Sequence, residues 1–352
     1  MAVKFVSKIK YYTLVAMKLI RNILLPVVPI YYLVTWLRNK FYDAGIFKST
    51  SYDFPLIAVG NLSVGGTGKT PMIEYLIRLL KSNYEVATLS RGYGRTTKGF
   101  VLADENTNAM RIGDEPFQFY SKFEAIKVAV DANRREGITN LRALTPKPDV
   151  ILLDDAFQHR KVKAGFYVLL TSYNALYVDD FLLPTGNLRE PKQGAKRANV
   201  IVVTKCPSSL SEKEKNEIIK RLKPNANQDV FFSSIEYSNT VYSLAEEQPL
   251  EFFKDKKITL VTGIANANPL VEYLKSKALD FKHLNFKDHH LFSENEINVL
   301  KEEHIILTTE KDYMRLSPHF KGEGNLYYLP IQVSIDDKLR FDRLINNYIE
   351  SC

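Results

Sequence analysis

Cysteine is scarce in this chain of 352 residues, where only Cys206 and Cys352 occur. The two lie so far apart in the sequence that they predict neither a disulfide framework nor a cysteine metal site. This usage is typical of a protein from a reducing compartment. Internal repeats and low-complexity tracts are also lacking, whereas apolar residues make up 45% of the chain, enough for a proper core. The length predicts two domains, or one large domain with additions.

Long hydrophobic runs are missing as well. The longest uncharged run covers residues 22–37 and contains Pro26 and Pro29, which we expect to break a helix. A helix that spans a bilayer needs about 20 consecutive apolar residues, so this run is too short for a comfortable span. No small-residue cleavage site ends the run, and we therefore expect no cleavable signal peptide.

Acidic residues are nearly absent from residues 1–48, which contain Asp43 alone. The basic residues of this segment are Lys4, Lys8, Lys10, Lys18, Arg21, Arg38, Lys40 and Lys48. The segment thus carries +7 of the formal net charge of +8, and the remaining chain is nearly neutral. A basic groove spread over the whole body is not expected, so we predict no nucleic-acid partner and one basic anchor instead.

Apolar residues of the same segment recur at helical spacing, opposite most of its basic residues. They are Phe5, Ile9, Tyr12, Ala16, Leu19, Ile20 and Ile23, and Tyr31, Tyr32 and Trp36 follow. Aromatic and basic residues beside an apolar stripe suit the headgroup region of a bilayer. We therefore predict that residues 1–48 form an amphipathic segment that lies in a membrane surface. The alternative is a helix that packs on its own domain.

A glycine-rich turn follows the first apolar run of the remaining chain, residues 55–60. Residues 61–71 read Asn-Leu-Ser-Val-Gly-Gly-Thr-Gly-Lys-Thr-Pro, and apolar residues at helical spacing follow over 72–80. Strand, glycine-rich turn and helix form the context that a phosphate-binding loop requires. The expected nucleotide-binding residues are Ser63, Val64, Gly65, Gly66, Thr67, Gly68, Lys69 and Thr70.

Each part of this loop has a chemical task. The glycines let successive backbone N–H groups point at an anion. Lys69 would reach the β- and γ-phosphates, and the Thr70 hydroxyl would ligate Mg²⁺ at the start of the helix. The pattern departs from the standard phosphate loop at Ser63, where a glycine is expected.

Apolar runs alternate with helical patterns along the rest of the chain. Buried parallel strands are predicted at 85–89, 126–130, 150–153, 167–171 and 200–204, with helices such as 115–123 and 211–222. A further strand is predicted at 231–235. After a polar connection, a second set of strands follows at 258–262, 281–284, 305–309 and 326–330, then a helix over 336–349. The predicted fold is α/β, with a P-loop NTPase-type parallel sheet flanked by helices and a smaller second α/β domain. The predicted boundaries are 1–48, 49–235 and 236–352.

Two acids end the predicted strand at 150–153. One carboxylate of Asp154 or Asp155, beside the phosphate loop, can hold Mg²⁺ directly or through water. Gln158 and His159 follow, which places an amide and an imidazole beside the metal. The alternative for His159 is a capping or core role.

Four further motifs carry charged side chains on predicted loops. Arg91 follows a strand in the run Ser-Arg-Gly-Tyr-Gly-Arg, which suits phosphate recognition at the carboxyl end of a parallel sheet. Asp114 and Glu115 begin a predicted helix, where acids also serve as simple caps. Arg189 and Glu190 share a proline-bracketed loop, and Asp288, His289 and His290 are consecutive in the second domain. A metal triad at these last three is not expected, because adjacent residues of a strand point to opposite sides; a carboxylate orienting an imidazole is the better interpretation.

Taken in order, these motifs resemble those of the tetraacyldisaccharide 4′-kinases, the lipid A 4′-kinases of Gram-negative bacteria. The resemblance rests on residues 60–71, 90–95, 113–116, 154–159, 183–190, 288–290 and 309–312. In that family a Ser or Thr is usual at the position of Ser63, which accounts for the departure noted above. The family's acid motif usually runs Asp-Asp-Gly-Phe-Gln-His, and Ala156 replaces the glycine here.

The resemblance implies phosphorylation, dependent on ATP and Mg²⁺, of the 4′-hydroxyl of tetraacyldisaccharide 1-phosphate. It implies a peripheral protein at the cytoplasmic face of the bacterial inner membrane. Asp114 is implied as the catalytic base, with His289 and Asp288 polarising it. The implied metal residues are Thr70, Asp154, Asp155 and Glu115. The implied substrate or transition-state residues are Arg91, Gln158, His159, Arg189 and Glu190.

Two other functions remain open from the residues alone. A partition-type ATPase switch carries a lysine just before Gly-Gly-x-Gly-Lys, whereas this chain has Val64 there. A GTP-dependent protein commonly reads guanine with Asn-Lys-x-Asp, and the nearest run, Thr204 to Pro207, lacks the aspartate. Dependence of nucleotide turnover on an acylated disaccharide would separate these alternatives from the kinase.

Overall fold

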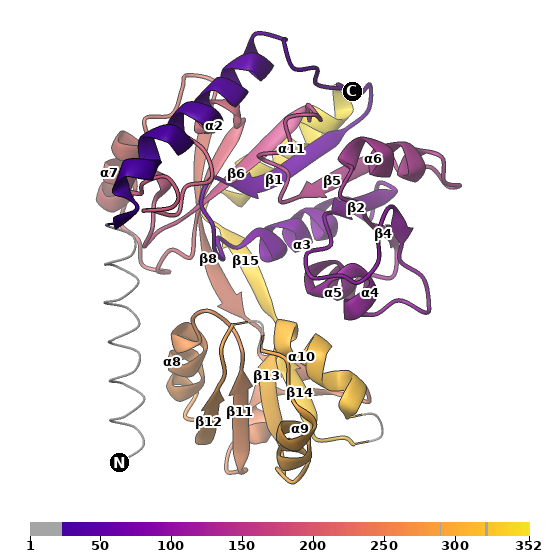
Figure 1. The fold of residues 1–352 in the computed structure, drawn as a ribbon. Helices are drawn as coiled ribbons and strands as arrows, with labels where there is room; N and C mark the ends of the chain where they lie inside the picture. Colours follow the sequence, from indigo (N-terminus) through magenta and orange to yellow (C-terminus); the bar gives the residue numbers. More distant parts are fainter. Residues whose placement is uncertain (1–22, 289, 321–322) are drawn as a thin grey trace. The chain divides into compact units, whose positions relative to one another are not determined.

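The computed structural model describes residues 23–288, 290–320 and 323–352 (Figure 1). The apolar stripe that starts at Phe5 therefore lies outside the described residues, apart from Ile23. Within the described part of the chain, no helix is both long enough and apolar enough to cross a membrane. The chain divides into two compact units. One contains the described residues up to Lys69 with Asp155–Ser233 and Leu339–Cys352; the other contains Thr70–Asp154 and Ser234–Lys338.

Parallel strands form the centre of the first unit, in the order β8-β7-β6-β1. Their bounds are β1 Leu56–Asn61, β6 Phe166–Ser172, β7 Val200–Thr204 and β8 Asp229–Tyr237, and the last residues of β8 belong to the second unit. Every residue of β1 and β7 is buried, as expected of parallel strands that are covered on both faces. The regular helices are α2 Val28–Asp43, α7 Glu212–Leu222 and α11 Lys338–Glu350, with short 3-10 turns η1 Leu25–Val27, η2 Tyr177–Asp179 and η3 Lys192–Arg197.

The second unit contains two groups of strands. The first has the order β5-β2-β4-β3, with β3 antiparallel to β4. These strands are β2 Val86–Ser90, β3 Val101–Leu102, β4 Ile126–Val130 and β5 Val150–Asp154. The accompanying helices are α3 Lys69–Leu80, α4 Ala109–Ile112, α5 Asp114–Lys122 and α6 Arg134–Arg142. The register pairs Val86 with both Ile126 and Val150, so the three parallel strands end together at one edge.

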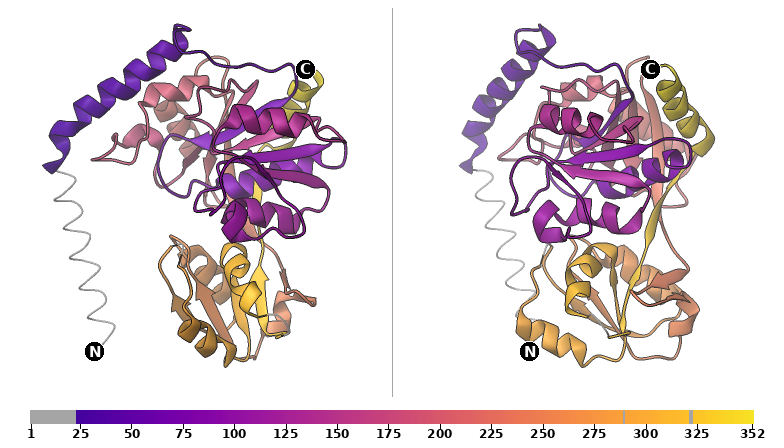
Figure 2. Two further views of the ribbon diagram at one scale, coloured as in Figure 1. Left: turned by 45° about the vertical axis from the view of Figure 1, so that its right-hand side comes forward. Right: turned by 90° about the vertical axis from the view of Figure 1, so that its right-hand side faces the viewer.

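The other group is a six-stranded sheet with the order β10-β9-β14-β13-β11-β12 (Figure 2). Its strands are β9 Thr240–Tyr242, β10 Glu247–Pro249, β11 Ile258–Thr262, β12 Phe281–Asn285, β13 Ile306–Thr309 and β14 Leu326–Leu329, and β15 Ile331–Ile335 follows. Its helices are α8 Asn268–Ser276, α9 Glu294–Lys301 and α10 Glu310–Leu316, with 3-10 turns η4 Leu250–Phe253 and η5 Ser317–His319. Successive strand residues face opposite sides. Leu260 packs in a cluster with α8, and Val261 packs in another with α9 and α10.

These elements confirm the predicted α/β class. The ends of the predicted strands lie within one or two residues of the ends of the observed strands. The expected break is present at Pro26, which lies in the 3-10 turn η1 before α2 begins at Val28. Pro29 does not break a helix: it lies in the first turn of α2, where a missing N–H costs no hydrogen bond, and the helix continues to Asp43.

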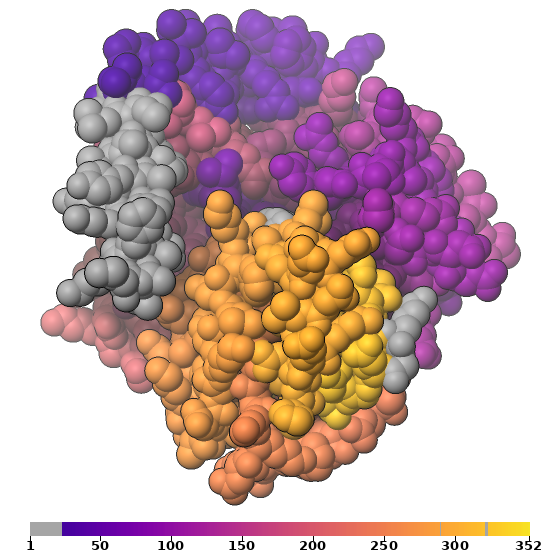
Figure 3. All heavy atoms as spheres, turned by 60° about the horizontal axis from the view of Figure 1, so that its bottom comes forward, coloured from indigo at the N-terminus to yellow at the C-terminus, as the bar shows by residue number. Residues whose placement is uncertain are grey.

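Helix α2 presents two faces of different chemistry. Its outer face carries large apolar side chains that are exposed: Ile30, Leu33, Val34, Leu37 and Phe41. Figure 3 shows this helix in indigo, with its side chains at the surface. Its inner face consists of partly or fully buried side chains, most of them polar: Tyr31, Thr35, Arg38, Asn39 and Tyr42. An amphipathic helix normally buries its apolar face, so the orientation of α2 is inverted.

Candidate active site

The phosphate-binding loop connects β1 to α3, as the sequence predicts. Gly65 and Gly68 have φ values of 108° and 86°, which other residues rarely adopt. Thr67 fixes the turn, because its hydroxyl accepts a hydrogen bond from the Asn61 amide (2.7 Å) and its carbonyl accepts one from the Thr204 hydroxyl (2.8 Å). Buried side chains at the ends of β1 and β7 therefore hold the loop in shape.

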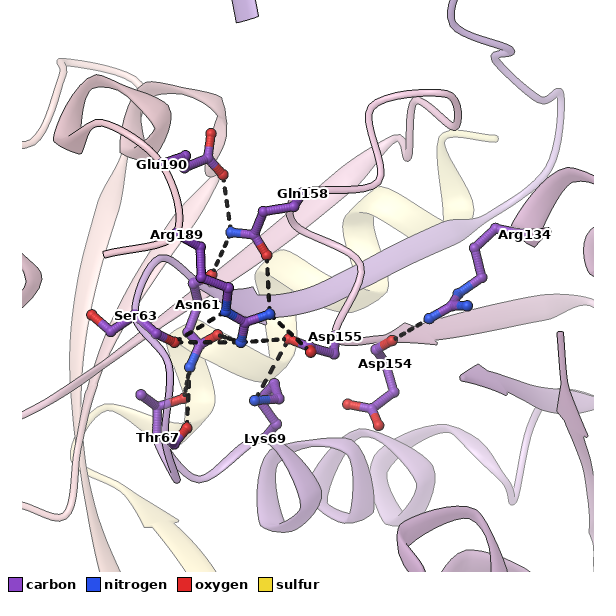
Figure 4. A network of polar contacts seen from close by, with 11 residues as sticks. Asn61, Ser63, Thr67, Lys69, Arg134, Asp154, Asp155, Gln158, Arg189 and Glu190 are labelled. Atoms are coloured by element: carbon purple, nitrogen blue, oxygen red, sulfur yellow. Dashed lines mark hydrogen bonds and ion pairs between the residues drawn. The ribbon is translucent and has the colours of Figure 1, made fainter. Parts of the chain in front are cut away.

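Two cations converge on Asp155 at this loop (Figure 4). The Lys69 Nζ lies 3.6 Å from one carboxylate oxygen. The Arg189 guanidinium donates to both oxygens, at 3.0 and 3.1 Å, in the bidentate geometry that suits a carboxylate. Burial alone would raise the pKa of Asp155, but the charges of Lys69 and Arg189 lower it below its ordinary value. Asp155 is thus a carboxylate at neutral pH.

Arg189 also joins its own loop to the phosphate loop. Its guanidinium donates to the Asn61 amide oxygen (2.7 Å) and to the Ser63 carbonyl (3.3 Å). The backbones pair as well, because the Arg189 N–H donates to the Leu62 carbonyl and the Val64 N–H donates to the Asn187 carbonyl, both at 2.8 Å. The arginine is therefore held beside the turn that would receive the phosphates.

Glu190 supports this arrangement from behind. Its side chain is almost fully buried, and its carboxylate accepts hydrogen bonds from Asn39 (2.8 Å), Gln158 (3.0 Å) and Arg197 (2.7 Å). The Gln158 amide also donates to the Asn61 carbonyl at 2.8 Å. The structure thus brings together the predicted residues Gln158, Arg189 and Glu190. Glu190 supports the phosphate loop through Gln158, which bonds to Asn61.

Thr70 and Asp154 are covalent neighbours of Lys69 and Asp155. Thr70 is the second residue of α3, and Asp154 is a buried residue at the end of β5, where its carbonyl accepts a bond from the Arg134 guanidinium. No group of three or more His, Cys, Asp or Glu side chains within the described residues is arranged to hold a metal ion by itself. Mg²⁺ bound with a nucleotide takes one or two carboxylates and phosphate oxygens instead. The hydroxyl of Thr70 and the carboxylates of Asp154 and Asp155 are oxygen ligands of the type that such a nucleotide-bound Mg²⁺ takes.

The second unit brings three other predicted acids near two basic residues of α10. Asp114 is the first residue of α5, and its carboxylate accepts hydrogen bonds from Arg315 Nε (3.0 Å) and Nη2. The Lys311 Nζ lies 3.7 Å from Glu115 and 3.7 Å from Asp288. His289, the predicted partner of Asp114, lies outside the described residues.

Arg315 is itself fixed by a buried carboxylate. Its guanidinium donates to Asp312 at 3.4 Å, and Asp312 accepts bonds from the Gly263 N–H and the Thr309 hydroxyl, both at 2.8 Å. The strand β13 and the start of α10 therefore determine where Arg315 holds Asp114. Residues 309–312 belong to the predicted family motif, whereas Arg315, one helical turn beyond Asp312, was not among the predicted site residues.

The remaining predicted residues occupy less constrained places. Arg91 is exposed directly after β2, and His159 is partly exposed after the acid motif. His290 contacts Glu296 at 3.1 Å and stacks on Phe286 with ring centroids 4.7 Å apart.

Two residues at the loop were missed by the sequence reasoning. Asn61 ends β1 and contacts both Thr67 and Arg189. Lys205 follows β7 with a φ of 57° and donates to the Gly66 carbonyl, and burial lowers its pKa below the ordinary value. Its position directly after a buried strand was the available signal.

A phosphate loop between a parallel strand and a helix, with the carboxylate of Asp155 and a loop-bound arginine beside it, defines a P-loop nucleotide-binding α/β protein. Comparison with known proteins gives the particular family. A family model described as tetraacyldisaccharide-1-P 4′-kinase matches residues 20–350. The chain therefore belongs to the tetraacyldisaccharide 4′-kinase family, as its motifs predict.

Individual relatives agree with this assignment. The tetraacyldisaccharide 4′-kinase of Flavobacterium johnsoniae is 54% identical over 338 residues, which cover 95% of this chain and 98% of the relative. The enzyme of the same name from Bacteroides thetaiotaomicron is 44% identical, with 93% and 92% covered. A crystal structure of LpxK from Aquifex aeolicus in complex with ATP is 30% identical, covers 94% of this chain and 99% of that one, and has a TM-score of 0.76. The comparison confirms the fold class.

Proposed function

We infer that this protein is a lipid kinase that transfers the γ-phosphoryl group of ATP to the 4′-hydroxyl of tetraacyldisaccharide 1-phosphate. The observation that carries this conclusion is the convergence of Lys69 and Arg189 on Asp155 beside the phosphate loop, in a chain that belongs to this kinase family. Phosphoryl transfer requires mainly positioning and charge neutralisation from a protein, and this arrangement supplies both.

We assign the nucleotide to the loop from Ser63 to Thr70. Its backbone N–H groups and the Lys69 ammonium hold the phosphates, and the guanidinium of Arg189 neutralises charge on the phosphoryl group in transfer. Bound Mg²⁺ would neutralise further phosphate charge, and we assign Thr70, Asp154, Asp155 and Glu115 as the residues that hold it. Because Asp155 is engaged by two cations in the structure, nucleotide phosphates would compete with it for both.

We assign proton transfer to Asp114. Its carboxylate would accept the proton of the 4′-hydroxyl as that oxygen bonds to the γ-phosphorus and the bond to the ADP oxygen breaks. Arg315 holds the carboxylate at the start of α5, which supports a fixed orientation. We assign His289 and Asp288 as the groups that polarise Asp114.

We assign recognition of the acceptor to Arg91, Gln158 and His159. Arginine suits a sugar phosphate because its planar donors match phosphate oxygens. Gln158 already lies next to Arg189, at 3.3 Å between side chains, and is therefore close to the phosphoryl-transfer residues. In this proposal residues 49–235 serve the nucleotide, and residues 236–352 contribute the groups that act through Asp114.

We propose that the protein acts as a peripheral protein at the cytoplasmic face of the bacterial inner membrane. The outer face of α2 exposes a continuous set of apolar side chains, and such faces mark interaction sites. The segment that contains it carries +7 of the net charge, which attracts anionic headgroups. Both properties favour a bilayer surface as the partner, and residues 1–48 as the segment that binds it.

The experiment is to measure ADP release by the full chain with Mg-ATP in detergent micelles. One sample contains tetraacyldisaccharide 1-phosphate, a second contains its deacylated form, and a third contains no acceptor. The kinase assignment predicts rapid release only with the acylated acceptor. Equal release in all three samples would favour a nucleotide-hydrolysing switch. The Lys69→Ala protein serves as the control for contaminating ATPases.

A further inference from the structure

The polar inner face of α2 contacts the same residues that organise the phosphate loop. Three side chains spaced along the helix each donate one hydrogen bond. The Tyr31 hydroxyl donates to the Arg189 carbonyl (2.9 Å), and the Arg38 guanidinium donates to the Gln158 carbonyl (2.9 Å). The Asn39 amide donates to the Glu190 carboxylate (2.8 Å).

The contact between Asn39 and Glu190 is the most buried of the three. Asn39 is 9% exposed and Glu190 is 1% exposed. A buried carboxylate that loses one of its donors keeps its charge without the compensating bond, which is costly. The remaining donors are Gln158 and Arg197, and Gln158 is itself bound to Arg189. Loss of the Asn39 bond would therefore disturb the side chains around Arg189.

The other two contacts act on the backbone. Tyr31 fixes the carbonyl of Arg189, and Arg38 fixes the carbonyl of Gln158. Burial and the nearby Glu190 carboxylate raise the pKa of Tyr31, so its hydroxyl remains a donor at neutral pH. At the C-terminal end of α2, the Arg160 guanidinium donates a hydrogen bond to the Asp43 carboxylate at 2.7 Å. The helix thus holds both chain segments that carry the polar network.

We propose that α2 is a positioning element of the active site, in which Asn39, Arg38 and Tyr31 hold Arg189 and Gln158 in place. The inference rests on the proposed kinase function. The outer face of the same helix would contact the bilayer. A lipid surface that binds α2 while its inner face holds Arg189 and Gln158 therefore stabilises that arrangement of the site by linkage. Membrane binding and turnover are therefore coupled through α2.

The test compares inner-face and outer-face variants of the full chain. Asn39→Ala should lower kcat about tenfold in detergent micelles, with little change in KM for ATP or in binding to anionic vesicles, because Arg189 acts on the phosphoryl group in transfer. Thr35→Ala is the matched control, since the Thr35 hydroxyl bonds only to carbonyls of α2 in the described structure, and it should retain full kcat. Leu33→Ser should weaken vesicle binding and leave kcat in micelles unchanged.

Coupling predicts one more result. Wild-type kcat should be higher with acceptor in anionic vesicles than in neutral micelles, and Leu33→Ser should lose this difference. Should Asn39→Ala fail to fold by circular dichroism, Tyr31→Phe, which removes one hydroxyl, should still lower kcat about threefold. Full kcat in folded Asn39→Ala or Tyr31→Phe, or equal wild-type rates on both surfaces, would overturn the proposal. An inactive wild-type protein would instead contradict the kinase assignment itself.

Discussion

A buried cluster of two acids and one lysine makes stability depend on pH. Glu74 lies on α3, Lys122 on α5 and Glu310 on α10, and the Lys122 ammonium donates to Glu74 (2.7 Å) and to Glu310. Glu74 also receives bonds from Gln118 and Arg78, each at 2.7 Å. Burial and the charge of Glu74 raise the pKa of Glu310 to about 7, although Lys122 opposes the shift.

The sign and size of the effect follow from this pKa. In the unfolded chain a glutamate titrates near 4.5, so between about 4.5 and about 7 the folded protein keeps a proton that the unfolded chain has released. Unfolding then releases a proton, and stability falls as pH rises. The stabilising contribution of Glu310 to the free energy of unfolding is complete below about pH 4.5 and is lost as the pH passes about 7. One unit of pKa difference corresponds to about 1.4 kcal/mol, so the total is at most roughly 3 kcal/mol.

The assay is chemical denaturation followed by circular dichroism, across this pH window, for wild type and Glu310→Gln. The glutamine is neutral at every pH, so the difference in unfolding free energy between the two proteins should shift by up to roughly 3 kcal/mol in favour of the variant as pH rises. Glu124→Gln, at an exposed position near the end of α5, is the control and should follow wild type. Parallel pH profiles for wild type and Glu310→Gln would refute the assignment of the proton to Glu310.

Other predictions concern the site. Lys69→Ala should reduce turnover at least about a hundredfold, because an ammonium that neutralises phosphate charge is lost; near-normal kinetics would contradict the loop assignment. Arg189→Lys should lower kcat about tenfold or more, since a lysine cannot donate bidentately to Asp155 or bind Asn61 at the same time; an unchanged kcat would remove Arg189 from the transfer step. Asp114→Asn should lower kcat about a hundredfold while calorimetry finds ATP affinity preserved, whereas a loss of ATP binding would reassign Asp114 to the metal. Chelation of Mg²⁺ should abolish turnover. Added Mg²⁺ should restore turnover in the wild type and fail to do so in Asp155→Asn.

The phosphate loop and the strands could be predicted because their signals are local. Positive φ values at Gly65 and Gly68 are required wherever the chain must curl around an anion, so the glycine pattern alone is informative. Continuous apolar runs such as 150–153 and 200–204 predict buried parallel strands, and the structure confirms them.

The supports of the site could not be predicted because they join distant parts of the chain. Asn39 and Glu190 are 151 positions apart, and Asp114 and Arg315 are 201 positions apart. A lone asparagine in an apolar helix carries no local sign of such a partner. The prolines were expected to interrupt the N-terminal helix, and Pro26 does lie in the 3-10 turn before α2, whereas Pro29 lies within the first turn of α2. Only tertiary packing reveals that the polar side of α2 faces inward.

The most direct measurement of the central claim is the position of the transferred phosphate. The full chain is incubated with Mg-ATP and tetraacyldisaccharide 1-phosphate in detergent, and the lipid product is analysed by mass spectrometry and phosphorus NMR. We predict a bisphosphorylated lipid with the new phosphate on the 4′-oxygen, formed by wild type and absent with Lys69→Ala. Recovery of the acceptor unchanged while ATP is hydrolysed, or a phosphate at another hydroxyl, would contradict the account.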